Sequence, residues 1–250
     1  MKRYFILILL LSGFAVNGQN AEQLLEQANQ HYLAQEFQQA ASLYEQILSS
    51  GKESAQVYFN LGNAYYKTGD MNRAILNYER ARLLAPQDED IAFNLRMANQ
   101  YVVDNIEELP QPFFLRWRTT LVNRASSGAW ARLSAGSFIL FLLMAGLFLF
   151  SRTTGLKRIG FWTGVVVLLF SVLSFSFASR QQKLLRERNH AIVFCPRVTV
   201  KSSPSQAGTD LFLIHEGLKV QITNSLNNWK EVKLADGNKG WLPDSCLVKI

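Results

Sequence analysis

The sequence lacks the residue patterns by which many enzymes and nucleic-acid-binding proteins are recognised. It has no glycine loop that would cradle a phosphate and no histidine motif with metal-ligand spacing. Acidic residues are almost missing from residues 116–188, where eleven Lys and Arg accompany the single acid Glu187, whereas residues 19–108 carry thirteen Asp and Glu against six Lys and Arg. The basic residues flank apolar segments and do not alternate with stacking aromatic residues. They therefore indicate lipid headgroups and exclude a nucleic-acid partner.

Two stretches contain no charged residue, residues 133–151 and residues 159–179. At a rise of ~1.5 Å per residue, each would form a helix roughly 30 Å long, the thickness of the hydrocarbon core of a bilayer. A pair of buried core helices is the alternative, but too few residues remain to build the shell that it needs. We therefore predict a transmembrane helical hairpin with residues 152–158 as its loop. Neither stretch contains the ionisable residues that transporters need, so both helices are expected to be anchors.

The N-terminus has the pattern of a secretory signal. Lys2 and Arg3 precede an apolar run over residues 4–11, and small residues lead to a cleavage site after Gly18. An uncleaved anchor is the alternative, and it too would send the next domain across the membrane. Basic residues flank both ends of the hairpin, so the positive-inside rule does not choose its orientation. The signal does choose, and we expect both globular parts in the periplasm of a bacterial inner membrane.

Residues 21–104 resemble themselves at an offset of 34. Small and aromatic residues recur at this offset: Ala28 and Gly62, Tyr32 and Tyr66, Ala40 and Ala74, Tyr44 and Tyr78. A partial third copy includes Phe93, and Pro86 is placed to start its helix. The pattern resembles the tetratricopeptide repeat, a helix–turn–helix unit of 34 residues. It predicts an all-α domain that residues 89–103 cap.

The resemblance to tetratricopeptide repeats implies a concave surface that binds a protein or peptide. Asparagine suits such a surface, because its amide both donates and accepts hydrogen bonds. The paired Lys and Arg of a clamp for C-terminal carboxylates are missing from the matching positions. The positions of the family's binding surface correspond here to Asn29, Tyr32, Asn60, Asn63, Tyr66, Lys67 and Asn94.

Residues 189–250 change to short alternating runs that predict five strands, with Asp236-Gly237 as a hairpin turn. The segment resembles bacterial SH3 domains in Glu216-Gly217, in Trp229 and in the run at 236–243. It is therefore expected to be an all-β SH3-like barrel. The acidic, tyrosine-rich loop that eukaryotic SH3 domains use for proline-rich ligands is absent. Trp229 remains a candidate binding residue, and the bacterial relatives suggest peptidoglycan as an alternative ligand.

The two cysteines of the chain, Cys195 and Cys246, both fall in this segment. The first and last strands of SH3-like barrels are neighbours, so a disulfide is geometrically allowed in an oxidising compartment. Two unpaired, partly buried thiols are the preferred interpretation.

These segments account for the whole chain, and no stretch of about 100 residues is left for a catalytic domain. We therefore expect no enzymatic activity, cofactor or metal. The predicted order is a signal peptide (1–18), a tetratricopeptide-repeat domain (19–108), an interfacial linker (109–132), a transmembrane helix (133–151), a cytoplasmic loop (152–158), a second transmembrane helix (159–179), a basic linker (180–188) and an SH3-like domain (189–250).

Signal, repeats, paired membrane helices and SH3-like barrel, in this order, resemble the Bacteroides aerotolerance (Bat) family, in particular its BatE type. Residues 86–95 and 211–217 carry this resemblance most clearly. It implies a non-enzymatic scaffold that assembles with von Willebrand A-type membrane proteins, is linked indirectly to a MoxR-type ATPase, and helps the cell to tolerate oxygen or envelope stress. A cell-wall-binding sensor or tether acting through the SH3-like domain is the alternative.

Overall fold

The computed structural model describes residues 21–107, 109–110 and 112–250, so the predicted signal peptide lies outside the described residues. The chain forms two compact units. Of the described residues, one unit combines those before Pro110 with Asn189–Ile250, and the other contains those of Pro110–Arg188. The first unit therefore consists of two segments that are separated in sequence by the whole of the second.

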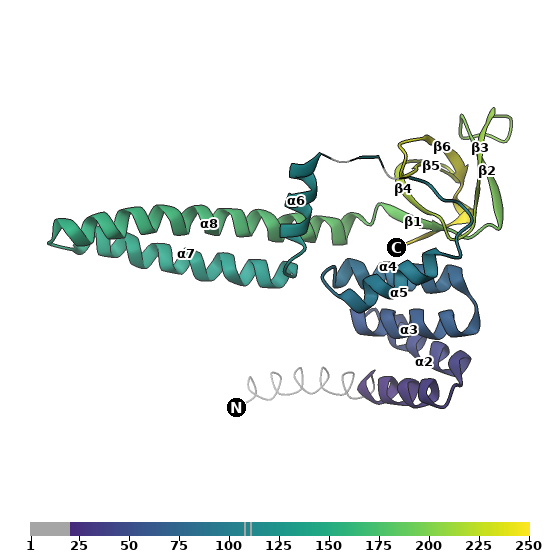
Figure 1. Cartoon of the computed structure of the whole chain (residues 1–250), viewed down its shortest axis with the longest axis horizontal. Helices are drawn as coiled ribbons and strands as arrows, with labels where there is room; N and C mark the ends of the chain where they lie inside the picture. The colour runs from purple at the N-terminus through teal and green to yellow at the C-terminus, as the bar shows by residue number, and fades with distance from the viewer. Residues whose placement is uncertain (1–20, 108, 111) are drawn as a thin grey trace, which may run out of the picture. The chain divides into compact units, whose positions relative to one another are not determined.

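The first unit begins with a stack of antiparallel helices (Figure 1). After helical residues 21–33 come α2 (Phe37–Ser49), α3 (Ala55–Thr68), α4 (Met71–Leu84) and α5 (Glu89–Asn99). Gly62 is required where α3 meets α4, because a Cβ atom there would lie 2.7 Å from the Tyr78 ring. Pro86 does not begin the last helix as expected. The α5 helix begins three residues later, because the Asp88 carboxylate accepts hydrogen bonds from the backbone N–H groups of Asp90 and Ile91 and so caps its N-terminus.

The C-terminal segment of this unit is a seven-stranded antiparallel sheet with the order β3-β2-β6-β5-β4-β1-β7. The five strands expected from the sequence correspond to β2–β6. Two short outer strands, β1 and β7, were missed because they hold only four and three residues. The strands are β1 (His190–Val193), β2 (Arg197–Lys201), β3 (Asp210–His215), β4 (Lys219–Leu226), β5 (Trp229–Lys233), β6 (Lys239–Pro243) and β7 (Leu247–Lys249).

The pairing of β1 with β7 brings the two cysteines together. Val193 lies opposite Leu247 in this antiparallel pair, and Cys195 follows β1 while Cys246 precedes β7. Their Cα atoms are 5.0 Å apart and their sulfur atoms form a disulfide. The preferred expectation of two unpaired thiols therefore differs from the structure, because it gave too little weight to this pairing.

The repeats and the sheet share one hydrophobic core, although the sequence suggests two separate domains. Ile192 of β1 and the terminal Ile250 are buried in the same cluster as Ile75 of α4 and Leu95 of α5. Residues 102–107 run along the sheet, where Val102 and Ile106 pack on its core, and farther on the Leu109 N–H donates to the Ala235 carbonyl. The repeats are thus covered at their C-terminal end by the sheet as well as by α5.

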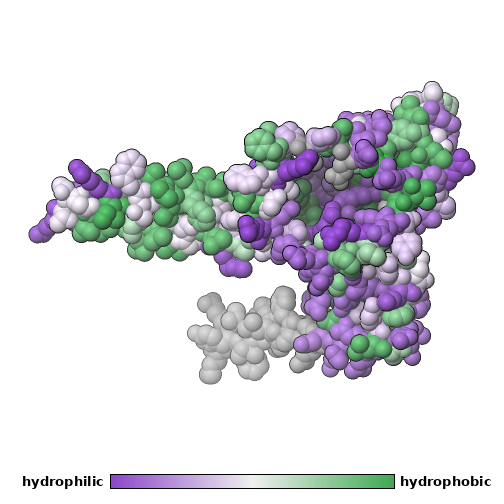
Figure 2. Space-filling view, in the orientation of Figure 1, coloured by the Kyte–Doolittle hydropathy of each residue, from purple (hydrophilic) through white to green (hydrophobic). Residues whose placement is uncertain are grey.

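The second unit contains α6 (Phe113–Val122), α7 (Ser127–Phe150) and α8 (Thr154–Glu187). The α7 and α8 helices are long and apolar enough to cross a membrane, and Figure 2 shows apolar residues along both. Only Ser151–Thr153 separate them, instead of the expected seven-residue loop. The expected linkers at 109–132 and 180–188 are largely helical as well, because Arg, Lys, Gln and Leu end an apolar run without ending a helix.

Small residues of α8 face α7 along the hairpin. A Cβ atom at Gly160 would lie 2.9 Å from the Met144 carbonyl oxygen, so the two backbones are in close contact there. Farther along, Ser134 and Ser171 exchange hydrogen bonds, each hydroxyl donating to the other's carbonyl at 3.0 and 2.9 Å. Close backbone approach and reciprocal hydroxyl bonds are the interactions that hold helices together within lipid.

Candidate partner-binding surface

A line of asparagines crosses the first helices of the successive repeats. The side-chain oxygen of Asn29 accepts hydrogen bonds from the Tyr44 hydroxyl at 2.7 Å and from the Asn60 amide at 3.3 Å. The same arrangement recurs 34 residues later. There the Asn63 oxygen accepts from the Tyr78 hydroxyl and from the Asn94 amide, both at 2.8 Å. The asparagines predicted to bind a partner therefore first bind one another and the tyrosines of the second helices.

The hydrogen bonds of this network have a fixed donor and a fixed acceptor. Tyr44 and Tyr78 are buried, and burial raises the pKa of Tyr44 to about 12 and raises that of Tyr78 further. Both phenols thus remain protonated donors at physiological pH, and the oxygens of Asn29 and Asn63 are committed as acceptors. In the described part of the chain, the amide nitrogens of Asn29 and Asn63 have no acceptor within the protein.

The remaining predicted residues of the repeats lie beside this line. Tyr32 is half-buried and packs edge-on against Phe37. Tyr66 is half-buried too, with its ring centroid 6.1 Å from that of Tyr101, and its hydrogen bond with Tyr101 raises its pKa. Lys67 is exposed in the last turn of α3. Lys67 is therefore the predicted position whose side chain can change with least effect on the repeats, whereas the Tyr66 ring also packs on their core.

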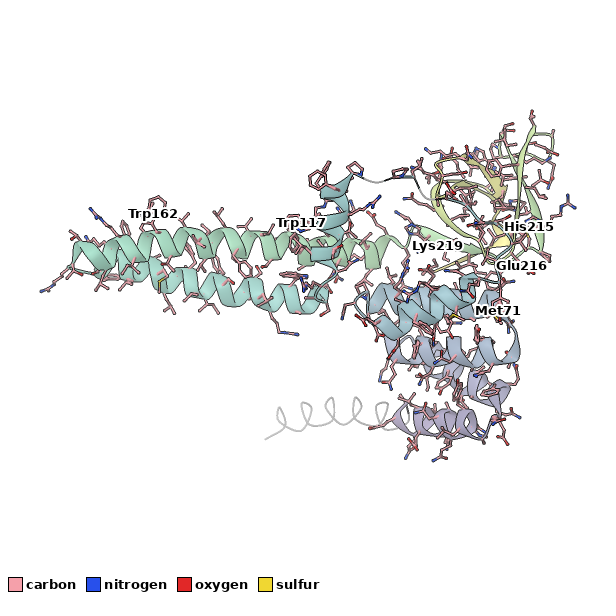
Figure 3. The ribbon with its side chains drawn as sticks, in the orientation of Figure 1. Met71, Trp117, Trp162, His215, Glu216 and Lys219 are labelled. Atoms are coloured by element: carbon pink, nitrogen blue, oxygen red, sulfur yellow. A yellow bond between two sulfur atoms is a disulfide. The ribbon has the colours of Figure 1, made fainter. Side chains whose placement is uncertain are left out.

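A pocket of about 330 Å³ lies next to Tyr101, within the first unit. Apolar side chains of Met71, Ile75 and Val102 line it, together with the carboxylates of Asp70 and Glu216. Figure 3 marks Met71 and Glu216. Glu216 comes from the turn between β3 and β4 and accepts a hydrogen bond from the Asn72 amide at 2.6 Å. Sequence reasoning missed this pocket because its wall combines residues far apart in the chain.

An ion pair between repeats and sheet is another contact that the sequence did not reveal. The Lys219 ammonium lies 2.7 Å from a Glu79 carboxylate oxygen, and the Glu79 side chain is only 6% exposed. Arg82 lies 3.3 Å from the same oxygen. A glutamate at a helix position that faces the core is the one sequence signal that points to such a partner. This ion pair joins β4 to α4, the helix that packs against α3 and α5, which carry three of the four asparagines.

Trp229 does not join this surface. It begins β5, where it pairs with Leu226 of β4 and Pro243 of β6, and its side chain is half-buried in the sheet. His215 is likewise held within the unit, because its Nδ1 lies 2.9 Å from an Asp104 carboxylate oxygen. In the described residues, no three His, Cys, Asp or Glu side chains gather in a way that would hold a metal ion.

Comparison with known proteins supports the helical part of this description. A family model of the tetratricopeptide repeat matches residues 55–88, which include α3 and α4. No curated protein matches the chain. The match confirms the repeat predicted from the 34-residue offset, and tetratricopeptide repeats indicate a role in protein–protein interaction.

Proposed function

We propose that this protein is a membrane-anchored scaffold that binds a protein partner on its repeats. The observation that carries the proposal is the repeat match, on α3 and α4, in a chain whose later helices α7 and α8 are long and apolar enough to cross a membrane. In this proposal, α7 and α8 anchor the chain and perform no transport. The repeats and the sheet form one body that presents the asparagine line, Tyr66 and Lys67 to the partner.

Two further observations support the arrangement at the membrane. The first unit uses segments from both sides of the hairpin, which requires both segments to lie on one side of the bilayer. Two crossings satisfy this requirement and a single crossing does not. The Cys195–Cys246 disulfide suits an oxidising compartment such as the periplasm. Digestion of intact spheroplasts with an added protease tests the orientation, because a periplasmic unit would be cut and a cytoplasmic one protected.

For the partner, we propose the assembly that the Bat-family resemblance implies, with von Willebrand A-type membrane proteins and, through them, a MoxR-type ATPase. The test is recovery of these proteins with the full chain from detergent-solubilised membranes. Tyr66→Phe combined with Lys67→Glu is expected to abolish recovery, because it removes the Tyr66 hydroxyl and reverses the charge at Lys67 beside the asparagine line, while it keeps the ring that packs on the repeat core. Gln39→Ala combined with Gln46→Ala, at exposed positions of α2, is the matched control. Asn63 is left intact because its oxygen holds both Tyr78 and Asn94.

Equal recovery of von Willebrand A-type proteins by the wild type and the α3 variant would remove the proposed surface. Sedimentation of the full chain with purified peptidoglycan tests the sensor or tether alternative. Co-sedimentation that depends on Trp229, together with no recovery of a protein partner, would replace the scaffold by that alternative.

A further inference from the structure

The α6 helix carries three aromatic side chains that the second unit leaves uncovered. Phe113 is 83% exposed, Phe114 56% and Trp117 67%. Phe113 and Trp117 are four residues apart, so they lie on one face of the helix. Such a cluster is costly in water, where each exposed aromatic ring forgoes the gain from burial. The hydroxyls of Thr119 and Thr120 donate to backbone carbonyls of the same helix at 2.9 and 3.0 Å, which suits a poorly hydrated surrounding.

The position of α6 on the hairpin is fixed by hydrogen bonds at its C-terminal end. The Gln181 amide of α8 donates to the carbonyls of Val122 and Ala125 at 2.8 and 2.9 Å, and the Trp130 indole N–H donates to Val122 at 2.9 Å. Gln181 is only 7% exposed, so this attachment is firm. Figure 1 shows α6 running across α8 and not along it. Gln181 follows the uncharged stretch by two residues, so α6 branches off where that stretch ends.

A second exposed tryptophan gives the distance to the other end of the hairpin. Trp162 is 66% exposed on α8, near the connection to α7, and Figure 3 marks both it and Trp117. Trp162 and Gln181 are nineteen residues apart, which is about 29 Å along a helix and matches the hydrocarbon thickness of a bilayer. Tryptophans at both ends of such a span are typical of the two membrane–water interfaces.

The charge around α6 has one sign. Residues 110–132 and 180–188 contain eight Lys and Arg and one acid, Glu187, a net charge of +7. Arg116, Arg118 and Arg124 are all exposed. A helix with an apolar aromatic face and exposed arginines binds at the surface of membranes that contain acidic lipids.

We propose that α6 is a lipid-binding helix that lies in the headgroup layer, with Phe113, Phe114 and Trp117 at the acyl boundary and Arg116 and Arg118 on the phosphates of acidic phospholipids. The inference rests on the proposed function in one respect, that α7 and α8 cross the bilayer. It adds a second contact with the membrane and names the lipid class. The helix holds the start of the hairpin at a fixed depth.

The test uses the full chain in nanodiscs of phosphatidylcholine, with or without phosphatidylglycerol, and a fluorescent label on Trp117→Cys or on Leu140→Cys. The native cysteines stay in their disulfide, and both positions are exposed in the unit, so the labels leave its packing intact. Lipids brominated near the headgroup are expected to quench the label at 117. Lipids brominated near the chain ends are expected to quench the label at 140.

Quenching at 140 but not at 117 would overturn the lipid-binding helix and leave the anchor in place. This holds even if the label at 117 is shielded from water, because a protein partner would shield the label without quenching it. No quenching at either position would overturn the anchor and the proposed function as well. Arg116→Gln with Arg118→Gln is expected to lower the equilibrium constant for binding of α6 to the lipid surface of phosphatidylglycerol discs roughly thirty-fold, because each arginine contributes a factor of roughly five. Arg152→Gln with Arg158→Gln, at the other end of the hairpin, should leave it unchanged. An equal effect of both pairs would overturn the assignment of acidic lipid to α6.

Discussion

Replacing Lys219 with methionine tests whether the repeats and the sheet form one folded body. The change keeps most of the side-chain volume but leaves the Glu79 carboxylate, 6% exposed, with Arg82 as its remaining basic partner at 3.3 Å. Removing one member of a fully buried ion pair costs about 3–5 kcal/mol, and an exposed pair contributes about 0–1 kcal/mol. Lys219 is 34% exposed, so we expect an intermediate cost of about 2 kcal/mol for Lys219→Met. Glu79→Gln should cost less, about 1 kcal/mol, because Lys219 can then turn toward water.

Hydrogen–deuterium exchange of the full chain in detergent measures these costs locally. A cost of 2 kcal/mol corresponds to a roughly thirty-fold larger opening equilibrium, and we expect it in peptides from both α4 and β4. The double variant should cost less than the sum of the two single variants, because the pair is lost only once. Lys239→Met, at an exposed position of β6, is the matched control and should change little. The view that the ion pair joins the two parts would be refuted if the free-energy costs of the two single variants were strictly additive. It would also be refuted if exchange became faster in β4 but not in α4.

Three other perturbations follow from the same structure. Gly160→Leu should separate α7 from α8 and increase protease cleavage near their connection, because backbone atoms around Met144 leave no room for a Cβ atom. Gly155→Leu is the control and should have no effect, because the space around a Cβ atom there is open. Tyr78→Phe should weaken the repeats by about 1 kcal/mol in urea unfolding, whereas Asn63→Ala should cost about 2 kcal/mol because it leaves the buried hydroxyl without its acceptor; equal costs would contradict this. Burial first, and then Lys219 and Arg82 against the opposing effect of Glu79, lower the pKa of His190. The contribution of His190 to stability should therefore be complete above about pH 6.5, the pKa of histidine in the unfolded chain, and be lost as the pH falls below that value. The urea midpoint of the wild type should fall between about pH 7.5 and 5.5, and the part of this fall that is due to His190 should be missing in His190→Gln.

The sequence predicted the features that repeat or that are long. Tyr44 and Tyr78, at equivalent places in two copies, disclosed the repeat, and the uncharged runs disclosed α7 and most of α8. Hydrogen bonds within the asparagine line were not foreseen. They depend on side-chain conformations. Asparagine also suits both a position that binds a partner and a position that accepts from a tyrosine hydroxyl, so the residue type at Asn63 does not distinguish these two roles.

The union of repeats and sheet could not be predicted, since nothing in the sequence around Glu79 refers to Lys219, 140 residues later. The two short outer strands escaped notice for a related reason. Three or four residues carry too little alternation to indicate a strand, and β7 is defined mainly by its pairing with β1. Strand pairing is also what brings the cysteines together. The helix ends were misjudged where Arg and Lys mark the limit of an uncharged run but remain good helix formers.

The discontinuous first unit has a consequence for biosynthesis. The ribosome completes α4 long before it makes the partners of that helix in the sheet, so Ile75 and the Glu79 carboxylate lack this part of their cover while α6, α7 and α8 are synthesised. Only when the last sixty or so residues emerge can Ile192, Ile250 and Lys219 close over them. Completion of the first unit is thereby made dependent on synthesis of the whole chain, and a chain that stalls before its final strands would display an unfinished surface to the proteases that remove incomplete products.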